Sequence, residues 1–279
     1  MLQQTTVATV LRRYGSFLER FKSLASIAQA SEEELLKAWE GLGYYRRARN
    51  LYMVAQMTGG VLPTTAEELM RLPGVGKTTA HAIASFAYGA QLPILDVNVK
   101  RIVGRVYGNY NEKGLWEGAW QLLGDSPAPL FNQAMMDLGS LICQPTPQCT
   151  HCPLKSQCGR YPDPPKQQKR RPVERVAIIV ASDRQGRLWL QRRETELLGG
   201  LWGFAQVPID ATRVVIDGEE MAIDERMHKG SLRHLYTHFE LQADVYLLFL
   251  EREKEGWLMP SEIERLPLST LDRKVLRLL

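Results

Sequence analysis

The chain has 279 residues, a formal net charge of +4 and 44% hydrophobic residues, which is enough apolar material for one large or two ordinary domains. Its longest apolar runs, VAIIVA and VYLLFL, have the length of strands and fall short of the roughly 18 residues that a membrane span needs. The N-terminal stretch shows no charged leader followed by an apolar segment. No signal peptide and no membrane association are therefore expected, and the expected location is the cytoplasm.

Residues 1–142 have the pattern of successive helices. SEEELLKAWEGLG begins with Ser31 and Glu34 at the spacing of a capping box, and TTAEELMRL repeats this spacing with Thr65 and Glu68. Apolar residues recur at helical spacing in the segments that follow. A helical domain is therefore predicted over residues 1–142.

The stretch LPGVGKTTA, residues 72–80, lies between two predicted helices. A nucleotide-binding P-loop needs G-x-x-x-x-G-K-[ST] after a strand, whereas the two glycines here are only two residues apart. The pattern instead favours a backbone grip on a phosphate at the start of a helix, made by Gly74, Val75, Gly76 and Lys77. A tight helix–helix turn without a ligand fits these residues equally well.

All four cysteines of the chain lie in one short segment, residues 143–158. Their spacing is C-x5-C-x2-C-x5-C, which indicates a metal or cluster site rather than scattered disulfides. Four thiolates suit either zinc or a [4Fe–4S] cluster, although structural zinc sites usually show two close pairs. The candidate ligands are Cys143, Cys149, Cys152 and Cys158, and His151 between them is interpreted as a surface residue.

Residues 159–175 differ from what precedes them. GRYPDPPKQQKRRPVER has four prolines, a basic cluster and no apolar periodicity, which predicts an interdomain linker. Two interpretations of the basic cluster stay open, a solvated tether and a segment that follows a DNA duplex. Its members are Arg160, Lys166, Lys169, Arg170, Arg171 and Arg175.

A second domain, α+β in class, is predicted over residues 176–279. VAIIVASDRQGRLWLQRR has two apolar runs around a turn at Gly186 and predicts a hairpin, and HFELQADVYLLFLE predicts another long strand.

Six strings occur in order along the chain: MLQQT (1–5), GLGYYRRARN (41–50), LPGVGKTTA (72–80), ILDVNVKR (94–101), FNQAMMDLG (131–139) and LRHLYTHFEL (232–241). Together they resemble the MutY-type adenine DNA glycosylases, a branch of the helix-hairpin-helix glycosylases that carries an iron–sulfur cluster. The resemblance implies a mostly α helix-hairpin-helix domain, a cluster loop over residues 143–158 with a [4Fe–4S] cluster, and a C-terminal Nudix-like α+β domain. It also implies a bacterial monomer, associated with the nucleoid when bound to double-stranded DNA that contains adenine opposite 8-oxoguanine.

The resemblance implies a catalytic role for three residues. Asp96 matches the carboxylate that stabilises the cationic sugar as the N-glycosidic bond breaks. Asn98 matches the amide beside it, and Thr78 would line the same pocket. A helix N-cap is the alternative role for Asp96, and one side chain can serve both. Val97 stands where the family usually has glycine.

The same resemblance bears on the reaction type. Bifunctional lyases of the superfamily carry their lysine nucleophile two residues after the last hairpin glycine, where this chain has Thr78. Lys77 is one residue early, about 100° away around a helix. Monofunctional hydrolysis is therefore expected, and the alternative is an endonuclease III-type lyase that works through Lys77.

The family places its general-acid glutamate two residues before the MLQQT string, with which the given sequence begins. On this basis the chain is expected to bind DNA and to excise adenine poorly. A non-catalytic, lesion-binding fragment is thus another alternative.

Further DNA contacts follow from the resemblance. Gln3 and Gln4 match residues that enter the duplex near the lesion, and Tyr44 matches an aromatic wedge beside the unusual base. A polar chain end and a solvated aromatic and arginine face are the plain alternatives.

The second domain carries no metal-binding Nudix box, so it is predicted to recognise the lesion rather than to catalyse a second reaction. Tyr236, Thr237 and His238 match the family's contact with 8-oxoguanine. The plain alternative is an alternating strand with its histidines directed outward.

Overall fold

The computed structural model describes residues 1–165, 170–194, 198–223, 228–251 and 254–279. The chain forms two compact units, residues 1–60 with 169–279 and residues 61–168. This division runs through the predicted helical domain 1–142. The physical reason is a shared core, because Leu198 and Leu201 are buried among the first helices of the chain.

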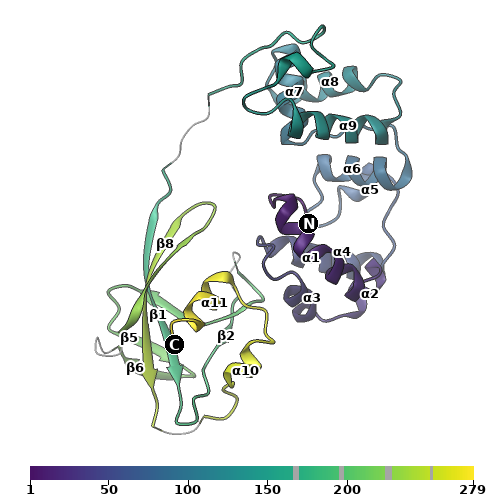
Figure 1. The fold of residues 1–279 in the computed structure, drawn as a ribbon. Helices are drawn as coiled ribbons and strands as arrows, with labels where there is room; N and C mark the ends of the chain where they lie inside the picture. The colour runs from purple at the N-terminus through teal and green to yellow at the C-terminus, as the bar shows by residue number, and fades with distance from the viewer. Residues whose placement is uncertain (166–169, 195–197, 224–227, 252–253) are drawn as a thin grey trace. The chain divides into compact units, whose positions relative to one another are not determined.

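Four helices open the first unit (Figure 1). Ser31 and Glu34 form the predicted capping box, in which Ser31 Oγ accepts from the Glu34 amide and the Glu34 carboxylate accepts from the Ser31 amide. Phe17 and Trp39 meet edge to face, 5.8 Å between ring centroids, in the core of these helices. The helices are α1 (Val7–Arg20), α2 (Leu24–Gln29), α3 (Glu32–Ala38) and α4 (Arg46–Thr58).

A four-stranded sheet with the order β4-β1-β8-β7 forms the C-terminal part of the first unit. β1 and β8 are parallel, and the two outer pairs are antiparallel. The strands are β1 (Val173–Ser182), β4 (Ala205–Pro208), β7 (His228–Leu235) and β8 (Glu240–Phe249). Two short pairs accompany the sheet, β2 (Gln191–Arg192) with β3 (Trp202–Gly203) and β5 (Arg213–Ile216) with β6 (Glu219–Ala222).

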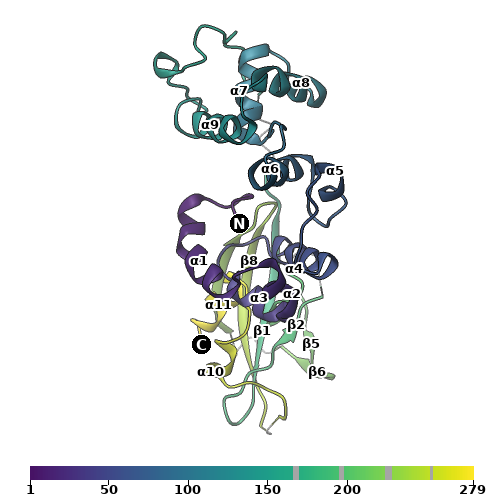
Figure 2. The same cartoon turned by 90° about the vertical axis from the view of Figure 1, so that its right-hand side faces the viewer.

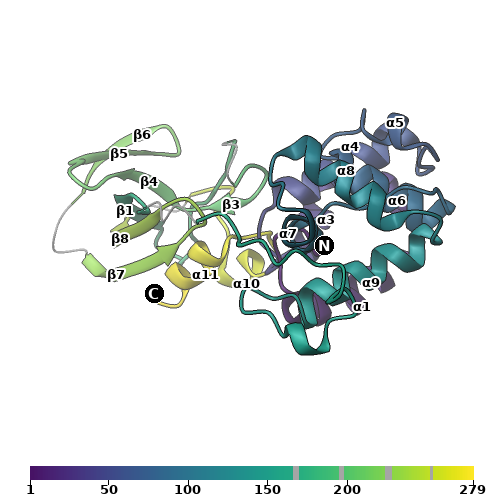
Figure 3. The ribbon, with the colours of Figure 1, turned by 90° about the horizontal axis from the view of Figure 1, so that it is seen from above.

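Two short helices, α10 (Pro260–Ile263) and α11 (Thr270–Leu276), cover one face of this sheet (Figure 3). Their Ile263, Leu271 and Val275 are buried against Ile178 and Val180 of β1. The opposite face buries a second cluster around Ile179, Ile216 and Trp257. The strand β8 and the turn at Gly186 agree with the pattern of the sequence.

The second unit is helical (Figure 2). Its core centres on α7, whose Val99, Ile102 and Val103 pack against α8 and α9. The buried amide of Asn132 donates to Ser85 Oγ and to the Leu92 carbonyl and accepts from the Ile94 amide. The elements are α5 (Ala66–Leu69), α6 (Lys77–Tyr88), α7 (Val97–Tyr107), α8 (Glu112–Leu123), α9 (Ala128–Leu141) and the 3-10 helix η1 (Cys149–His151).

The predicted linker, residues 159–175, is partly structured. Its start runs along α7, where the amides of Gly159 and Tyr161 donate to the carbonyls of Val106 and Arg105, and its end already belongs to β1. Lys166 and Lys169 of the basic cluster lie outside the described residues. Throughout the described ranges, each helix is too short or too polar to cross a membrane.

Candidate functional site

The turn between α5 and α6, the predicted hairpin, contains two exposed glycines. Gly74 has φ +73°, so a side chain at this position would be strained. Gly76 is the N-cap of α6 and supplies no side-chain cap, and the first amides of a helix have no acceptor within the helix. The Val75 amide, in contrast, donates to the Leu72 carbonyl at 3.2 Å. The phosphate grip of Gly74–Lys77 stays a prediction, in which the Val75 amide is already engaged within the turn.

Lys77, the first residue of α6, lies against an aromatic ring. Its Nζ is 4.1 Å from the centroid of Trp116 on α8, at cation–π distance. The ring of His81 lies 5.0 Å from the same tryptophan. This contact holds the ammonium group against α8, although Lys77 directly follows Gly76 in the sequence.

His81 fastens α6 to the segment that leads to Asp96. It is buried, and its Nδ1 donates to the Pro93 carbonyl at 2.8 Å. Burial lowers the pKa of His81, and the nearby Lys77 adds to this effect, so the neutral ring is favoured. No motif of the sequence singled out this histidine.

Asp96 is the N-cap of α7, as the plain interpretation of the sequence predicts. Its Oδ1 accepts from the backbone amide of Val99 at 2.8 Å, and its Oδ2 lies 3.5 Å from the side-chain nitrogen Nδ2 of Asn98. Thr78 on α6 donates its hydroxyl to the Leu95 carbonyl at 3.1 Å. The three predicted catalytic residues are therefore brought together at one corner, where α6 and α7 begin.

Arg101, one turn further along α7, fixes the orientation of Asn98. Its Nη2 donates to Asn98 Oδ1 at 3.0 Å, which leaves the Asn98 NH2 group on the side of Asp96. The same guanidinium donates to the carbonyls of Gly139 and Cys143. Sequence reasoning missed this arginine, although it closes the string ILDVNVKR, because its partners are about 40 residues away.

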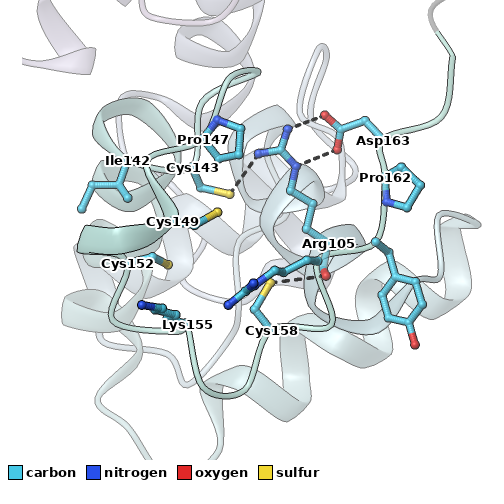
Figure 4. A pocket seen from close by; sticks show the side chains of 12 residues that line it. Arg105, Ile142, Cys143, Pro147, Cys149, Cys152, Lys155, Cys158, Pro162 and Asp163 are labelled. Carbon is cyan, nitrogen blue, oxygen red and sulfur yellow. Dashed lines mark hydrogen bonds and ion pairs between the residues drawn. The ribbon is translucent and has the colours of Figure 1, made fainter.

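The four cysteines line one cavity of about 220 Å³ together with Arg105, Lys155 and Arg160. Figure 4 shows their sulfur atoms directed toward the shared space. All four are free thiols and half-buried. Within the described ranges, no group of three or more His, Cys, Asp or Glu side chains could hold a metal ion as it stands.

A backbone hydrogen bond turns the chain back between the first two cysteines. The Gln148 amide donates to the Ile142 carbonyl at 3.0 Å, which returns the chain to the end of α9 before Cys149. His151 is exposed and does not line the cavity, in agreement with its interpretation as a surface residue.

A second cavity, of about 240 Å³, lies in the first unit between the loop before α4 and the β7–β8 turn. The hydroxyls of Tyr44 and Thr237 are hydrogen-bonded there at 2.7 Å. Tyr236 stacks on Phe239, and burial raises the pKa of Tyr236 to about 12, so its phenol stays neutral. The predicted residues Tyr44, Tyr236, Thr237 and His238 all line this cavity.

Two details of this cavity differ from the plain alternatives. Thr237 and His238 lie in a turn, closed by the bond from the Tyr236 amide to the Phe239 carbonyl, rather than in an alternating strand. Tyr44 has φ +49°, a conformation that is uncommon for a bulky residue and that the surrounding fold must hold in place.

Arg47 organises the N-terminal residues beside Tyr44. It donates to the carbonyls of Met1 and Gln3 and to Thr5 Oγ1, and its guanidinium lies 5.4 Å from the Tyr44 ring centroid. Gln3 and Gln4 are exposed at this end of the unit. Arg47 therefore connects the predicted glutamines with the predicted wedge, a role that the sequence did not indicate.

Two family models match the chain. Residues 1–116 match the HhH-GPD superfamily of base excision DNA repair proteins, and residues 176–278 match the NUDIX domain. These matches confirm the predicted fold class, a helix-hairpin-helix glycosylase domain followed by a Nudix-like α+β domain.

Relatives along the whole chain carry one name, adenine DNA glycosylase. The protein of Rattus norvegicus is 31% identical over 99% of this chain and 69% of its own length. That of Buchnera aphidicola subsp. Schizaphis graminum is 33% identical over 90% and 78%. A third, from Buchnera aphidicola subsp. Baizongia pistaciae, is 42% identical over 58% of this chain, which covers 49% of that relative's length.

Solved structures match the helical part of the chain. A thermostable thymine-DNA glycosylase is 31% identical with a TM-score of 0.53, over 57% of this chain and 79% of that one. A trapped covalent intermediate of endonuclease III with DNA is 26% identical with a TM-score of 0.51, over 56% and 78%.

Proposed function

The chain belongs to the adenine DNA glycosylases, base excision repair enzymes that hydrolyse N-glycosidic bonds, and from this premise we propose that it removes adenine opposite 8-oxoguanine or guanine in double-stranded DNA. The observation that carries the proposal is the corner at the start of α6 and α7. There Thr78, two residues after the N-cap of α6, donates to the carbonyl of Leu95, the residue before Asp96. The hairpin would hold the DNA backbone while the extruded nucleotide reaches the carboxylate.

Asp96 is assigned the stabilisation of the sugar cation. Adenine leaves with its bonding electrons, so positive charge develops on the sugar, and a nearby carboxylate stabilises that charge. Oδ1 of Asp96 is engaged by the Val99 amide, which fixes the plane of the carboxylate. Asn98, oriented by Arg101, lies beside Oδ2 and would help to place the attacking water.

Adenine also needs a general acid, which must be protonated near neutral pH. Glu34 does not fit this role. Hydrogen bonds from Ser31 lower the pKa of Glu34, and its other oxygen binds Arg20 at 2.7 Å. Its carboxylate caps α3, which is a structural task.

The lyase alternative is disfavoured by the position of Lys77. A Schiff-base nucleophile must reach the sugar carbon, whereas Nζ of Lys77 lies over the Trp116 ring. Thr78 occupies the position of the family's lysine and donates to the backbone beside Asp96. Hydrolysis by water without strand cleavage is the reaction that this arrangement supports.

The cavity of Tyr44 and Thr237 is proposed as the place where 8-oxoguanine is recognised. Tyr44 would insert as a wedge and Thr237 would offer its hydroxyl to the base. Both hydroxyls would exchange their mutual hydrogen bond of 2.7 Å for hydrogen bonds to DNA. The strained backbone of Tyr44 supports a functional role.

A [4Fe–4S] cluster fits the donor set of the cysteine cavity. Four thiolates suit either one zinc ion or a [4Fe–4S] cluster, and the cluster is the group that the family implies. The four thiols surround a cavity of about 220 Å³, whose Lys155 and Arg160 would offset the charge of four thiolates. When bound, the cluster would supply a rigid anchor for the loop.

The closing experiment measures adenine excision by the purified chain under single-turnover conditions, with borohydride present in a parallel sample. The proposal predicts slow release of free adenine, because Glu34 does not serve as the general acid, and no covalent DNA adduct. Specific DNA binding without any release of adenine would establish the non-catalytic lesion-binding alternative. An adduct that disappears in the Lys77→Ala variant would establish the lyase instead. Monomeric state and cytoplasmic location belong to the same proposal, and sedimentation and cell fractionation test them.

A further inference from the structure

A short segment that follows the last cysteine is bound along α7. Residues 159–163, which we name the strap, place the amides of Gly159 and Tyr161 on the carbonyls of Val106 and Arg105, at 3.2 and 3.1 Å. Carbonyls in the last turn of a helix have no partner within the helix. The strap therefore completes the C-terminal end of α7 and is more than a tether.

Aromatic packing holds the strap closely against this helix. The Tyr161 ring would lie 2.9 Å from a Cβ at Gly108, and the Tyr110 ring would lie 2.1 Å from a Cβ at Gly104. Tyr110 also donates its hydroxyl to Asp163 Oδ1 at 3.3 Å. Two glycines of α7 thus leave the space that these two rings fill.

One buried guanidinium connects the strap with the first cysteine. Arg105 is 9% exposed. Its Nε and Nη2 bind the two oxygens of Asp163 at 3.0 and 2.7 Å, in a bidentate pair. Its Nη1 donates to Cys143 Sγ at 3.4 Å and to the Gln144 carbonyl at 2.7 Å, and Nη2 also donates to the Pro145 carbonyl at 3.1 Å.

These contacts use all five N–H groups of Arg105, as Figure 4 shows for those to Asp163 and Cys143. The Arg105 carbonyl also accepts from Cys158 Sγ at 3.4 Å. A single residue therefore contacts both the first and the last of the four cysteines, and Asp163 fixes the direction of its side chain.

We propose that Arg105 is a positioning residue for the metal cluster and that Asp163 of the strap holds it in place. The inference rests on the cluster assigned under the proposed function. An N–H group that donates to a ligand sulfur withdraws electron density from it and stabilises the reduced, more negative cluster, which raises the reduction potential. Arg105 holds the start of the loop at Cys143–Pro145, and the strap holds the chain just after its end, so the four sulfurs keep their places.

Two variants of the purified full chain test this inference. Arg105→Met removes the donor and the positive charge, and both changes lower the reduction potential of the cluster. We expect iron loss to a chelator to be faster on the order of tenfold, the usual effect of losing hydrogen bonds to a charged group. Asp163→Asn keeps Arg105 as the donor but removes the ion pair that fixes its side chain, so a smaller acceleration of iron loss is expected.

The matched control is Glu117→Gln, which breaks the exposed pair of Lys113 and Glu117 on α8 in the same unit and should change nothing. The inference would be overturned if Arg105→Met lowered the melting temperature but left the reduction potential of the cluster and the rate of iron loss unchanged. If Arg105→Met does not fold, the test rests on Asp163→Asn. A rate of iron loss from Asp163→Asn equal to that from Glu117→Gln would also overturn the inference. A wild-type chain without iron would overturn the cluster proposal itself, a result that iron analysis distinguishes from the other two.

Discussion

The two ends of helix α7 carry opposite charges in opposite surroundings. At the N-terminal end Asp96 is half-buried and the next residue, Val97, is 73% exposed. At the C-terminal end Arg105 is buried, and the strap, the cysteine loop and Asp163 occupy its donors. Each sign of charge matches the helix dipole, but the first end is exposed to solvent at Val97, whereas the second end lines the cysteine cavity.

The two ends of α7 therefore differ in their proposed tasks, which are catalysis at Asp96 and support of the fold at Arg105. The Asp96 carboxylate has one firmly bonded oxygen, Oδ1 at 2.8 Å from the Val99 amide, and one weakly bonded oxygen, Oδ2 at 3.5 Å from the Asn98 side-chain nitrogen. The arginine is saturated by protein atoms, as a group that must hold the fold requires. Between them Arg101 connects the first turn of α7 with the cysteine loop, since it donates to Asn98 Oδ1 and to the Cys143 carbonyl.

The largest effect is expected at the N-terminal end of α7. Asp96→Asn keeps an N-cap of similar quality and removes the negative charge that faces the sugar cation. The rate of adenine excision should fall by at least about 100-fold, while the melting temperature stays close to that of the wild type. Single-turnover kinetics measure this, with the exposed Asp125→Asn as the matched control; equal rates for Asp96→Asn and the wild type would refute the catalytic assignment.

The next effect is expected at the residue between the two ends. Arg101→Met frees the side chain of Asn98 and removes a bond to the Cys143 carbonyl. Excision should slow by roughly tenfold, the usual cost of a lost bond to a charged group, and iron loss should accelerate. The neighbouring exposed Lys100→Met is the control. Equal excision rates for Arg101→Met and this control would contradict the role of Arg101 in orienting Asn98.

A smaller effect is expected in the first unit, at the second cavity, which Tyr44 and Thr237 line. Thr237→Val and Tyr44→Phe each remove one hydroxyl of the bonded pair and keep the shape of the side chain. Each should reduce the preference for 8-oxoguanine over guanine opposite adenine by about three- to tenfold. Binding titrations on the two duplexes measure the preference, with Thr212→Val as an exposed control. An unchanged preference in both variants would show that the cavity does not recognise the lesion.

The smallest effect concerns pH. His81 has a lowered pKa because it is buried, with Lys77 adding to the shift and Glu67 opposing it. The unfolded chain takes up the proton near the usual value of about 6.5, so the stability that the neutral ring contributes is present above this pH and is lost as the pH falls. Urea unfolding at several pH values should show a steeper decline for the wild type than for His81→Gln, and parallel declines would contradict this.

Local signals in the sequence predicted local structure. The capping box of Ser31 and Glu34, the N-cap at Asp96 and the turn at Gly74 all depend on residues within a few positions of one another, and all three are found. The strap was missed because it has no apolar periodicity; backbone carbonyls and one arginine hold it.

Long-range partners could not be read from the pattern. Arg105 meets Asp163 at a sequence separation of 58 residues, and Tyr44 meets Thr237 at 193. The packing of residues 1–60 with the C-terminal domain was missed for a similar reason, because Leu198 and Leu201 complete a core whose other members lie near the N-terminus. An isolated arginine or leucine carries no sign of such a partner.

The most direct test of the central claim measures binding to DNA that carries a cationic pyrrolidine analogue of the sugar opposite 8-oxoguanine, with a neutral tetrahydrofuran analogue for comparison. An enzyme that stabilises a cationic transition state binds its charged analogue more tightly. The wild type should prefer the cationic duplex, and Asp96→Asn should lose that preference while it binds the neutral duplex normally. If Asp96→Asn retained the full preference, the carboxylate at the start of α7 would not be the group that stabilises the sugar cation.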